Sequence, residues 1–231
     1  MRGLVAIVAF LLAATFLQAA DGQTTGASVV QIDLSKVLNS RGVATLVEGK
    51  VVPLQINGGV ITFAAAAALG VPTVHGVPND GRFPANADHP EVILPYATAG
   101  AGNQVRLSVN EDAYSFAVPP KKYARMLLFY TSYDSGAASL HFTLSYQDGS
   151  TETREIVVPD WYRNLEAGDK DCVYLASDLA KWSTDNRQLE VRHHNILGVD
   201  LHPSPDKVLT EIKVTKPAHP SVALWGATGQ D

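Results

Sequence analysis

The chain has 231 residues, and its 18 Lys and Arg against 23 Asp and Glu give a net charge of −5 at pH 7. No basic stripe or Lys/Arg cluster occurs, which argues against a nucleic-acid-binding protein and against a protein that docks on anionic membranes. Composition and charge therefore favour a neutral ligand.

The first twenty residues have the three-part layout of a secretory signal peptide. Arg2 precedes an apolar run from Leu4 to Leu17, and small residues follow at Ala19-Ala20. The run is shorter than the roughly 20 residues that span a bilayer, although an uncleaved N-terminal anchor is the alternative. We expect a protein that is secreted or periplasmic, in which residues 1–20 are the signal peptide and residues 21–231 form a single domain.

Cys172 is the only cysteine. An intramolecular disulfide is therefore excluded, and stability has to come from the core. Cys172 is either a reactive thiol or a small buried residue, and the second reading is favoured because free cysteines are among the most buried residue types.

Short β-patterned runs follow one another along the chain, separated by Gly, Pro, Asn and Asp. Ala124 to Tyr133 is nearly continuous in apolar residues, which predicts a strand covered on both faces. Leu140 to Tyr146 alternates, and Asp148-Gly149 then predicts a hairpin turn into Thr151 to Val158. The other expected strands are Val29–Leu34, Leu46–Ile56, Gln104–Val109, Tyr114–Val118, Cys172–Ala176, Leu189–His193, Asn195–Leu201, Val208–Thr215 and Val222–Trp225.

Two segments depart from this pattern. The stretch ITFAAAAALG, residues 61–70, predicts a short helical turn closed by Gly70. Gly70 to Pro95 is rich in Pro, Gly, Asn and Asp, and we expect a long loop with a functional surface. Many short strands without alternating helices indicate an all-β fold, an antiparallel β-sandwich with one short helical segment.

The sequence lacks the common catalytic motifs. It has no Gly-x-Ser-x-Gly elbow and no His-Glu-x-x-His or Cys-x-x-Cys spacing. His193 and His194 are adjacent, so in a strand they point to opposite faces. Asp200 and His202 share a face, with His75 or His89 as further partners, but solvated or hydrogen-bonded histidines are the favoured interpretation.

Carboxylates offer two further readings. A structural calcium ion takes oxygen ligands from loops, and the loop carboxylates available for it are Asp80, Asp88, Asp160, Asp169, Asp171 and Asp185. Glycoside cleavage needs two carboxyl groups across a cleft. The residues of the right type for that reaction are Glu152, Glu155, Asp160 and Glu190.

Aromatic residues with polar neighbours are the more informative group. Asp160-Trp161-Tyr162 follows Pro159, which ends the preceding strand, and Trp182 is expected in a loop with Asp185, Asn186 and Arg187. Flat rings beside hydrogen-bonding side chains are typical of carbohydrate sites. The alternative is that Trp161 and Trp182 fill the core, with Asp160 and Arg187 paired at its rim. The predicted carbohydrate-binding residues are Asp160, Trp161, Tyr162, Trp182, Asn186 and Arg187.

These features together resemble the galactose-binding-like jelly-roll modules of bacterial secreted glycoside hydrolases such as α-galactosidases. The resemblance covers roughly residues 100–228. It rests on the following segments: Phe116-Ala117-Val118-Pro119, Tyr123 to Phe129, Phe142 to Tyr146, Asp148-Gly149-Ser150-Thr151, Asp160-Trp161, Asp185-Asn186-Arg187 and the last strands from Val208 to Trp225. The segments 61–70 and 70–95 depart from those modules. Such modules also normally accompany a catalytic domain, whereas here the module is nearly the whole of the expected mature chain.

The resemblance implies a jelly-roll sandwich outside the cytoplasm that binds carbohydrate, with a calcium ion as an optional structural element. We therefore expect a secreted, non-catalytic carbohydrate-binding protein. The first alternative is a small glycoside hydrolase or polysaccharide lyase on the same fold that uses Asp160, Glu190 or a histidine near His193. The second is a cell-envelope protein whose sheet edges meet another protein.

Overall fold

The computed structural model describes residues 27–47, 50–52, 63–64, 75–100, 102–133, 136–182 and 188–231. The predicted signal peptide lies outside these ranges, as do Asp185, Asn186, Arg187 and most of the alanine run. In the ranges that the structure covers, no helix has the length and hydrophobicity needed to cross a membrane. The described chain is almost entirely β, so the predicted all-β antiparallel sandwich is confirmed.

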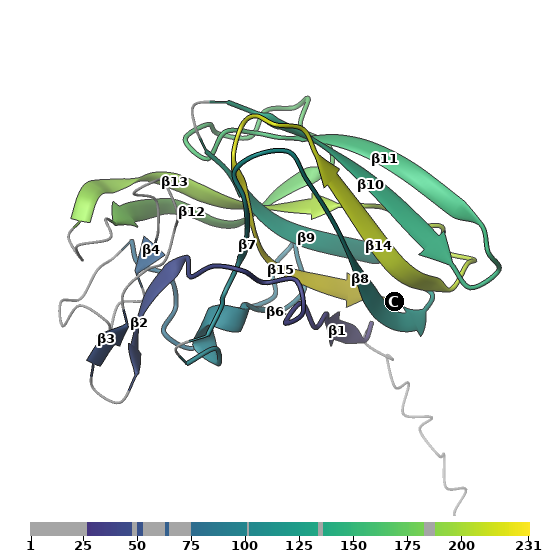
Figure 1. Ribbon diagram of the computed structural model, residues 1–231, viewed down its shortest axis with the longest axis horizontal. Helices are drawn as coiled ribbons and strands as arrows, with labels where there is room; N and C mark the ends of the chain where they lie inside the picture. The colour runs from purple at the N-terminus through teal and green to yellow at the C-terminus, as the bar shows by residue number, and fades with distance from the viewer. Residues whose placement is uncertain are drawn as a thin grey trace, which may run out of the picture.

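Two antiparallel sheets form the sandwich (Figure 1). The larger has the order β1-β15-β9-β13-β12, with β7 also pairing with β15, and the smaller has the order β11-β10-β14-β8. Their strands are β1 (Val29–Gln31), β7 (Arg106–Ser108), β8 (Asp112–Lys121), β9 (Arg125–Ser132), β10 (Ala138–Tyr146), β11 (Thr151–Val158), β12 (Cys172–Trp182), β13 (Gln188–Asp200), β14 (Leu209–Lys216) and β15 (Val222–Gln230).

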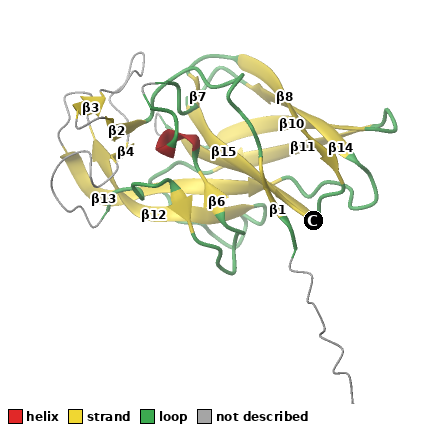
Figure 2. Cartoon of the chain, turned by 90° about the horizontal axis from the view of Figure 1, so that it is seen from below, coloured by secondary structure: helices red, strands yellow, loops and turns green. Residues whose placement is uncertain are grey.

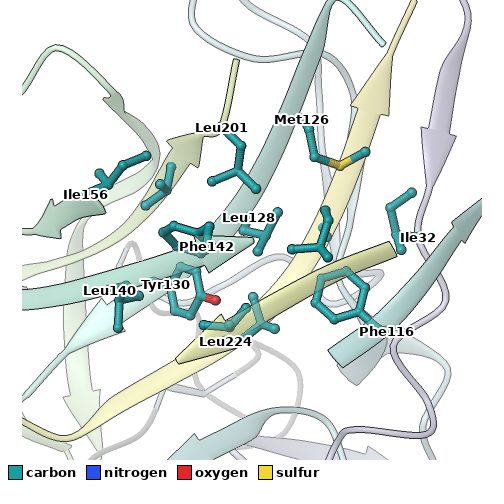
Figure 3. Close-up of a cluster of buried hydrophobic side chains, with 14 of the residues drawn as sticks. Ile32, Phe116, Met126, Leu128, Tyr130, Leu140, Phe142, Ile156, Leu201 and Leu224 are labelled. Atoms are coloured by element: carbon teal, nitrogen blue, oxygen red, sulfur yellow. The ribbon is translucent and has the colours of Figure 1, made fainter. Parts of the chain in front are cut away.

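The core between the sheets follows from simple alternation. Leu140, Phe142 and Leu144 on β10 are fully buried, and they face Met126, Leu128 and Tyr130 of β9 (Figure 3). The predicted hairpin is confirmed, since β10 pairs with β11 from Ser145↔Thr151 onward and Gly149 at the turn has φ 82°. Glycine adopts that backbone conformation without a steric penalty.

The larger sheet is covered on its second face as well. Leu127 and Phe129 alternate with the β9 residues of the first core and point the other way, into a second apolar cluster with Trp225 and Ile196. The cover comes from residues 43–105, which contribute β2 (Val43–Val47), β4 (Phe63–Ala64), β5 (Arg82–Phe83), β6 (Val92–Ile93) and the 3-10 turn η2 (Pro95–Ala97); β3 (Lys50–Val52) pairs with β2. Figure 2 views the molecule from this side, with η2 in front of β15. The prediction that Ala124 to Tyr133 is buried on both faces is therefore confirmed.

Three sequence expectations need correction. Pro119 and Pro120 do not end a strand but lie within β8, which tolerates them because it is the outer strand of its sheet and needs hydrogen bonds on one side only. Trp182 is the last residue of β12 and not a loop residue. Phe63–Ala64 forms a strand parallel to β2, within the segment 61–70 that was expected to contain a helical turn; residues 65–70 lie outside the described residues. The helical element of the described chain is η2.

The second apolar cluster, called the second core below, leaves little space for a side chain at Gly42. A Cβ built there would lie 2.7 Å and 2.8 Å from two carbons of the Trp225 indole, and 3.0 Å from Val105. The indole is buried and fixed, since its Nε1 donates to Thr131 Oγ1 at 3.0 Å. The cover and the sheet therefore fit each other tightly at this contact.

We expect Gly42→Ala to lower the free energy of unfolding by about 1–3 kcal/mol, because the added methyl overpacks a rigid contact. Urea denaturation followed by tryptophan fluorescence would measure it. Gly168→Ala is the matched control, since a Cβ at Gly168 has no neighbour within 4 Å. Equal midpoints for the two variants would contradict this packing of Trp225.

Candidate functional site

The structure places Trp161 and Trp182 in the interior, with exposed fractions of 2% and 6%. Trp161 belongs to the second core, where its ring meets Phe63 at 5.8 Å and Tyr133 at 5.0 Å. Trp182 packs with Ala44 and Ala180. Neither indole presents a face to solvent, which corrects the expectation of exposed rings and matches the core alternative. The sequence did not reveal this burial because the covering residues come from a distant part of the chain.

Asp160 has a local structural role. Its Oδ1 accepts a hydrogen bond from Tyr162 N at 2.9 Å, and its backbone carbonyl accepts one from Arg163 N at 2.9 Å. The carboxylate thus fixes the turn that follows Pro159, as Asp side chains do in Asx turns. The remaining predicted partners, Asn186 and Arg187, lie outside the described residues.

Tyr162 is the most exposed of the described members of the predicted set, with 44% of its area exposed. Its ring lies against Trp161 at 5.5 Å and against His194 at 4.4 Å. Lys181 Nζ donates to its hydroxyl at 3.3 Å. Buried aromatic neighbours therefore hold an exposed aromatic ring in one orientation.

Beside Tyr162, the pairing of β12 with β13 shifts register at four points between Tyr174 and Trp182, and the bulges at the two middle points lie next to each other. Ala176 pairs with Ile196 and Leu179 pairs with His194, so Ser177 and Asp178 together oppose Asn195 alone. The next pairing joins Lys181 to Glu190, so residues 191–193 of β13 oppose Ala180 alone. Each strand thus bulges within a few residues of the other. Bulges bend a strand and redirect its side chains, and they are common beside functional sites.

Both bulges contain a non-glycine residue with positive φ. Asp178 has φ 59° and His193 has φ 89°, and His202 is the one other example in the described chain. Asp and His adopt this conformation more readily than most residues, but it still costs free energy, and such strain concentrates at functional sites. His193 is exposed and the adjacent His194 is buried, as their predicted opposite orientation requires.

The bulges and the Tyr162 turn enclose a polar pocket of about 430 Å³. We call it the bulge pocket; it is lined by Tyr162, Asn164, Tyr174, Ser177, Asp178, His193 and Asn195. The side chains of Asn164, Ser177 and His193 form no hydrogen bond or ion pair within the described parts of the chain, and so can bind a ligand. Every lining residue carries a hydrogen-bonding side chain, and two of them are aromatic.

Buried hydrogen bonds set the floor of the bulge pocket. Asn195 is 3% exposed; its Oδ1 accepts from Asp178 N at 3.4 Å and its Nδ2 donates to Arg163 O at 3.2 Å. The amide of Asn195 therefore replaces a ladder hydrogen bond that the bulge removes. Asp178 is further held by His75, whose Nδ1 lies 3.4 Å from Asp178 Oδ2.

The loop that follows Tyr162 is fixed by Arg163. Its Nη2 donates to both carboxylate oxygens of Asp169, at 2.7 Å and 2.8 Å. Desolvation opposes ionisation of Asp169, but hydrogen bonds from Glu166 N and Arg163 outweigh it and hold the pKa of this carboxyl below its usual value. Leu165 N donates to the Tyr174 hydroxyl at 2.7 Å, which leaves the O–H proton of Tyr174 available to a ligand.

The described residues do not form the metal site that the sequence offered as an alternative. No group of three or more His, Cys, Asp or Glu side chains converges there as a metal site. Asp200 and His202 do meet, at 3.6 Å, but Asp200 is paired with Arg125 and His202 with Asp171. Of the carboxylates suggested for calcium, Asp80, Asp160, Asp169 and Asp171 each have a different partner, and Asp185 lies outside the described residues.

The paired carboxylates of a glycosidase are likewise not brought together in the residues that can be placed. Asp178 is the one carboxylate among the residues that line the bulge pocket. Glu152 binds Tyr146 and Arg154, and Glu155 binds Ser139, on the smaller sheet. The side chain of Glu190 is outside the described set.

Comparison with models of known protein families finds no match for this chain, and a search of curated proteins also finds none. Function therefore has to be inferred from the residues of the bulge pocket. Most of them, namely Asn164, Tyr174, Ser177, Asp178 and Asn195, were not predicted from the sequence, and His193 was considered only in connection with metal binding and with a hydrolase. Their one signal was the break between the predicted strands Leu189–His193 and Asn195–Leu201, which marks the bulge.

We expect His193→Gly to be more stable to unfolding than His193→Ala by about 1 kcal/mol, since both variants remove the imidazole but only glycine adopts positive φ without strain. Chemical denaturation of the two proteins would measure the difference. Val157→Gly and Val157→Ala, on an exposed β11 position, provide the matched pair in extended backbone. There alanine should be the more stable variant; the same order at His193 would contradict the bulge geometry.

Cys172 is buried, and burial raises the pKa of its thiol to about 12. We expect the native protein not to react with a thiol-specific disulfide reagent at about pH 8, because the thiolate is the reacting species. Full reaction in denaturant is the control. Rapid stoichiometric labelling of the folded protein would contradict the buried position and show that Cys172 is a reactive thiol.

Proposed function

We propose that this protein is a non-catalytic carbohydrate-binding protein whose ligand occupies the bulge pocket. The observation that carries the proposal is the pair of facing bulges in β12 and β13, which brings Ser177, Asp178 and His193 into one pocket with Tyr162. Strained backbone on two adjacent strands has no evident benefit for folding. The strain is explained if the role of the bulges is to present these side chains to a ligand.

The chemistry of the bulge pocket suits a sugar. A sugar ring offers an apolar C–H face and a rim of hydroxyl groups, which an aromatic face and mixed donors and acceptors can recognise. Tyr162 supplies the face, while Asn164, Ser177 and Asp178 supply hydrogen-bonding groups. The volume of about 430 Å³ lies in the range of roughly 300–1,000 Å³ for small-molecule sites.

This proposal keeps the predicted function but moves its site. Trp161 now acts from beneath, as a buried support for Tyr162 and His194. The resemblance to galactose-binding-like jelly-roll modules and the signal-peptide pattern of residues 1–20 support the same proposal, which places the protein outside the cytoplasm.

The test is retention on a glycan array and on affinity gels that contain neutral polysaccharides. We expect Tyr162→Ala to weaken binding to any retained glycan by about tenfold, the upper range for the loss of one aromatic contact, and Ser177→Ala to weaken it less. Val157→Ala removes an exposed side chain from the smaller sheet and should not change retention.

Other outcomes would replace the proposal. No retention on any glycan, or retention that Tyr162→Ala leaves unchanged, would refute it. Release of reducing sugars would identify a hydrolase. Co-purification with a protein partner, without glycan affinity, would favour the role in the cell envelope.

A further inference from the structure

A groove lies between β1 and β8, which are outer strands of the larger and the smaller sheet. Figure 1 shows where these two strands lie in the sandwich. Its volume is about 460 Å³. We call it the edge groove; residues on its two walls include Gln31, Asp33 and Leu34 after and within β1, and Phe116, Ala117 and Val118 of β8. It lies on different elements from the bulge pocket.

Polar contacts close the edge groove at both ends. At one end Lys121 Nζ of β8 reaches Ser28 Oγ at 2.6 Å and Asp231 at 2.6 Å. At the other end Arg106 donates to Val37 O at 3.4 Å and is paired with Asp112. The groove is thus a bounded opening whose two ends are cross-linked, and it is not a general separation of the sheets.

The β1 side of this groove has an unused hydrogen-bonding edge. Ile32 N donates to Ala227 O and Asp231 N donates to Ser28 O, so the backbone groups of residues 28, 30 and 32 point toward β15. Because these directions alternate along a strand, the N–H and C=O groups of Gln31 and Asp33 point away from the sheet. No backbone hydrogen bond to those groups occurs among the described residues.

A second pocket, of about 590 Å³, lies on the other side of the same segment. It shares Gln31, Asp33 and Leu34 with the edge groove, and its far wall is formed by Ile93, Leu94 and Pro95 at η2. The exposed backbone edge is therefore flanked by one pocket on each face. Consecutive side chains of an extended strand point to opposite faces, so a strand added here would direct neighbouring side chains into the two pockets.

We propose that this edge binds an extended peptide segment of another protein, which adds to the larger sheet as a strand beside β1. The peptide would carry apolar side chains at neighbouring positions, one for each pocket, and a basic residue near Asp33. Main-chain hydrogen bonds supply affinity in strand addition, and the flanking pockets supply specificity. The basic preference follows from the lining charges, because Asp33 and Glu211 outnumber Lys36.

The facing strand β8 is a poor acceptor, which fixes the peptide on β1. Pro119 and Pro120 have no N–H group, which deprives this end of β8 of backbone donors beside the groove. Such prolines protect edge strands from pairing with other chains. β1 has no proline, and the same alternation turns the backbone groups of Val29 and Gln31 outward, followed by those of Asp33 just after the strand.

The probe is a phage-displayed library of random linear nonapeptides, selected on the full chain, with enriched peptides resynthesised and measured by fluorescence anisotropy. We expect enriched peptides to bind at least tenfold more weakly to Ala117→Arg, whose side chain would fill the edge groove from an exposed β8 position. Thr153→Arg, exposed on β11, is the matched control and should bind as the original protein does.

Two measurements report on the edge hydrogen bonds directly. Asp33→Pro removes one outward N–H and should weaken binding more than Asp33→Ala, which removes only the carboxylate; unfolding midpoints would confirm that both variants fold. N-methylation along the peptide should abolish binding at every second amide. That period of two separates strand addition from binding through side chains alone.

Three results would overturn the proposal: no peptide enriched above background, enriched peptides that bind Ala117→Arg undiminished, or N-methylation effects without a two-residue period. A concentration-dependent dimer that Ala117→Arg disrupts would assign the edge to a second copy of this chain instead. Glycan binding at the bulge pocket should be unchanged in Ala117→Arg, which keeps this test independent of the proposed function.

Discussion

The structure depends on a single constraint: the larger sheet is apolar on both faces and has to be covered on both. β9 imposes this constraint, because its consecutive residues Met126, Leu127, Leu128 and Phe129 are fully buried and alternate between two cores. The smaller sheet covers one face with its own alternating strands. The other face requires a different cover, and residues 43–105 supply it with short strands and η2 packed around Trp225.

The same constraint shapes the bulge pocket. β12 and β13 extend beyond the smaller sheet (Figure 1). In that part, burial of both faces does not enforce a regular register between the two strands. Bulges can form there without opening the first core. Beneath the bulges, the ring centroids of Trp161 and His194 lie 4.2 Å apart, and Trp161 belongs to the second core. The pocket is therefore a strained surface feature on a rigid support.

The sequence predicted those parts of the fold in which one residue pattern decides the outcome. β10 and β11 read correctly because alternation and Asp148-Gly149 specify both the buried face and the turn. The burial of Trp161 was not decided by the sequence, since an indole after a strand suits a core and a ligand site equally until Phe63 and Tyr133 are known to cover it. The bulges were missed because Asp178 and His193 hold positive φ without the glycine that normally indicates it.

The outer strands β1 and β8 are not protected by the elements that cover the faces of the sheets. A sheet that is covered on both faces can still expose its outer strand, and the chain treats its two adjacent edges differently. β8 carries Pro119 and Pro120, whereas β1 leaves the backbone groups of Gln31 and Asp33 without partners among the described residues. If the edge groove were only a packing defect, prolines would be expected in β1 as they are in β8, because an unpaired edge is a risk for aggregation. The asymmetry between the two edges is therefore the feature that strand addition explains and that incomplete closure does not.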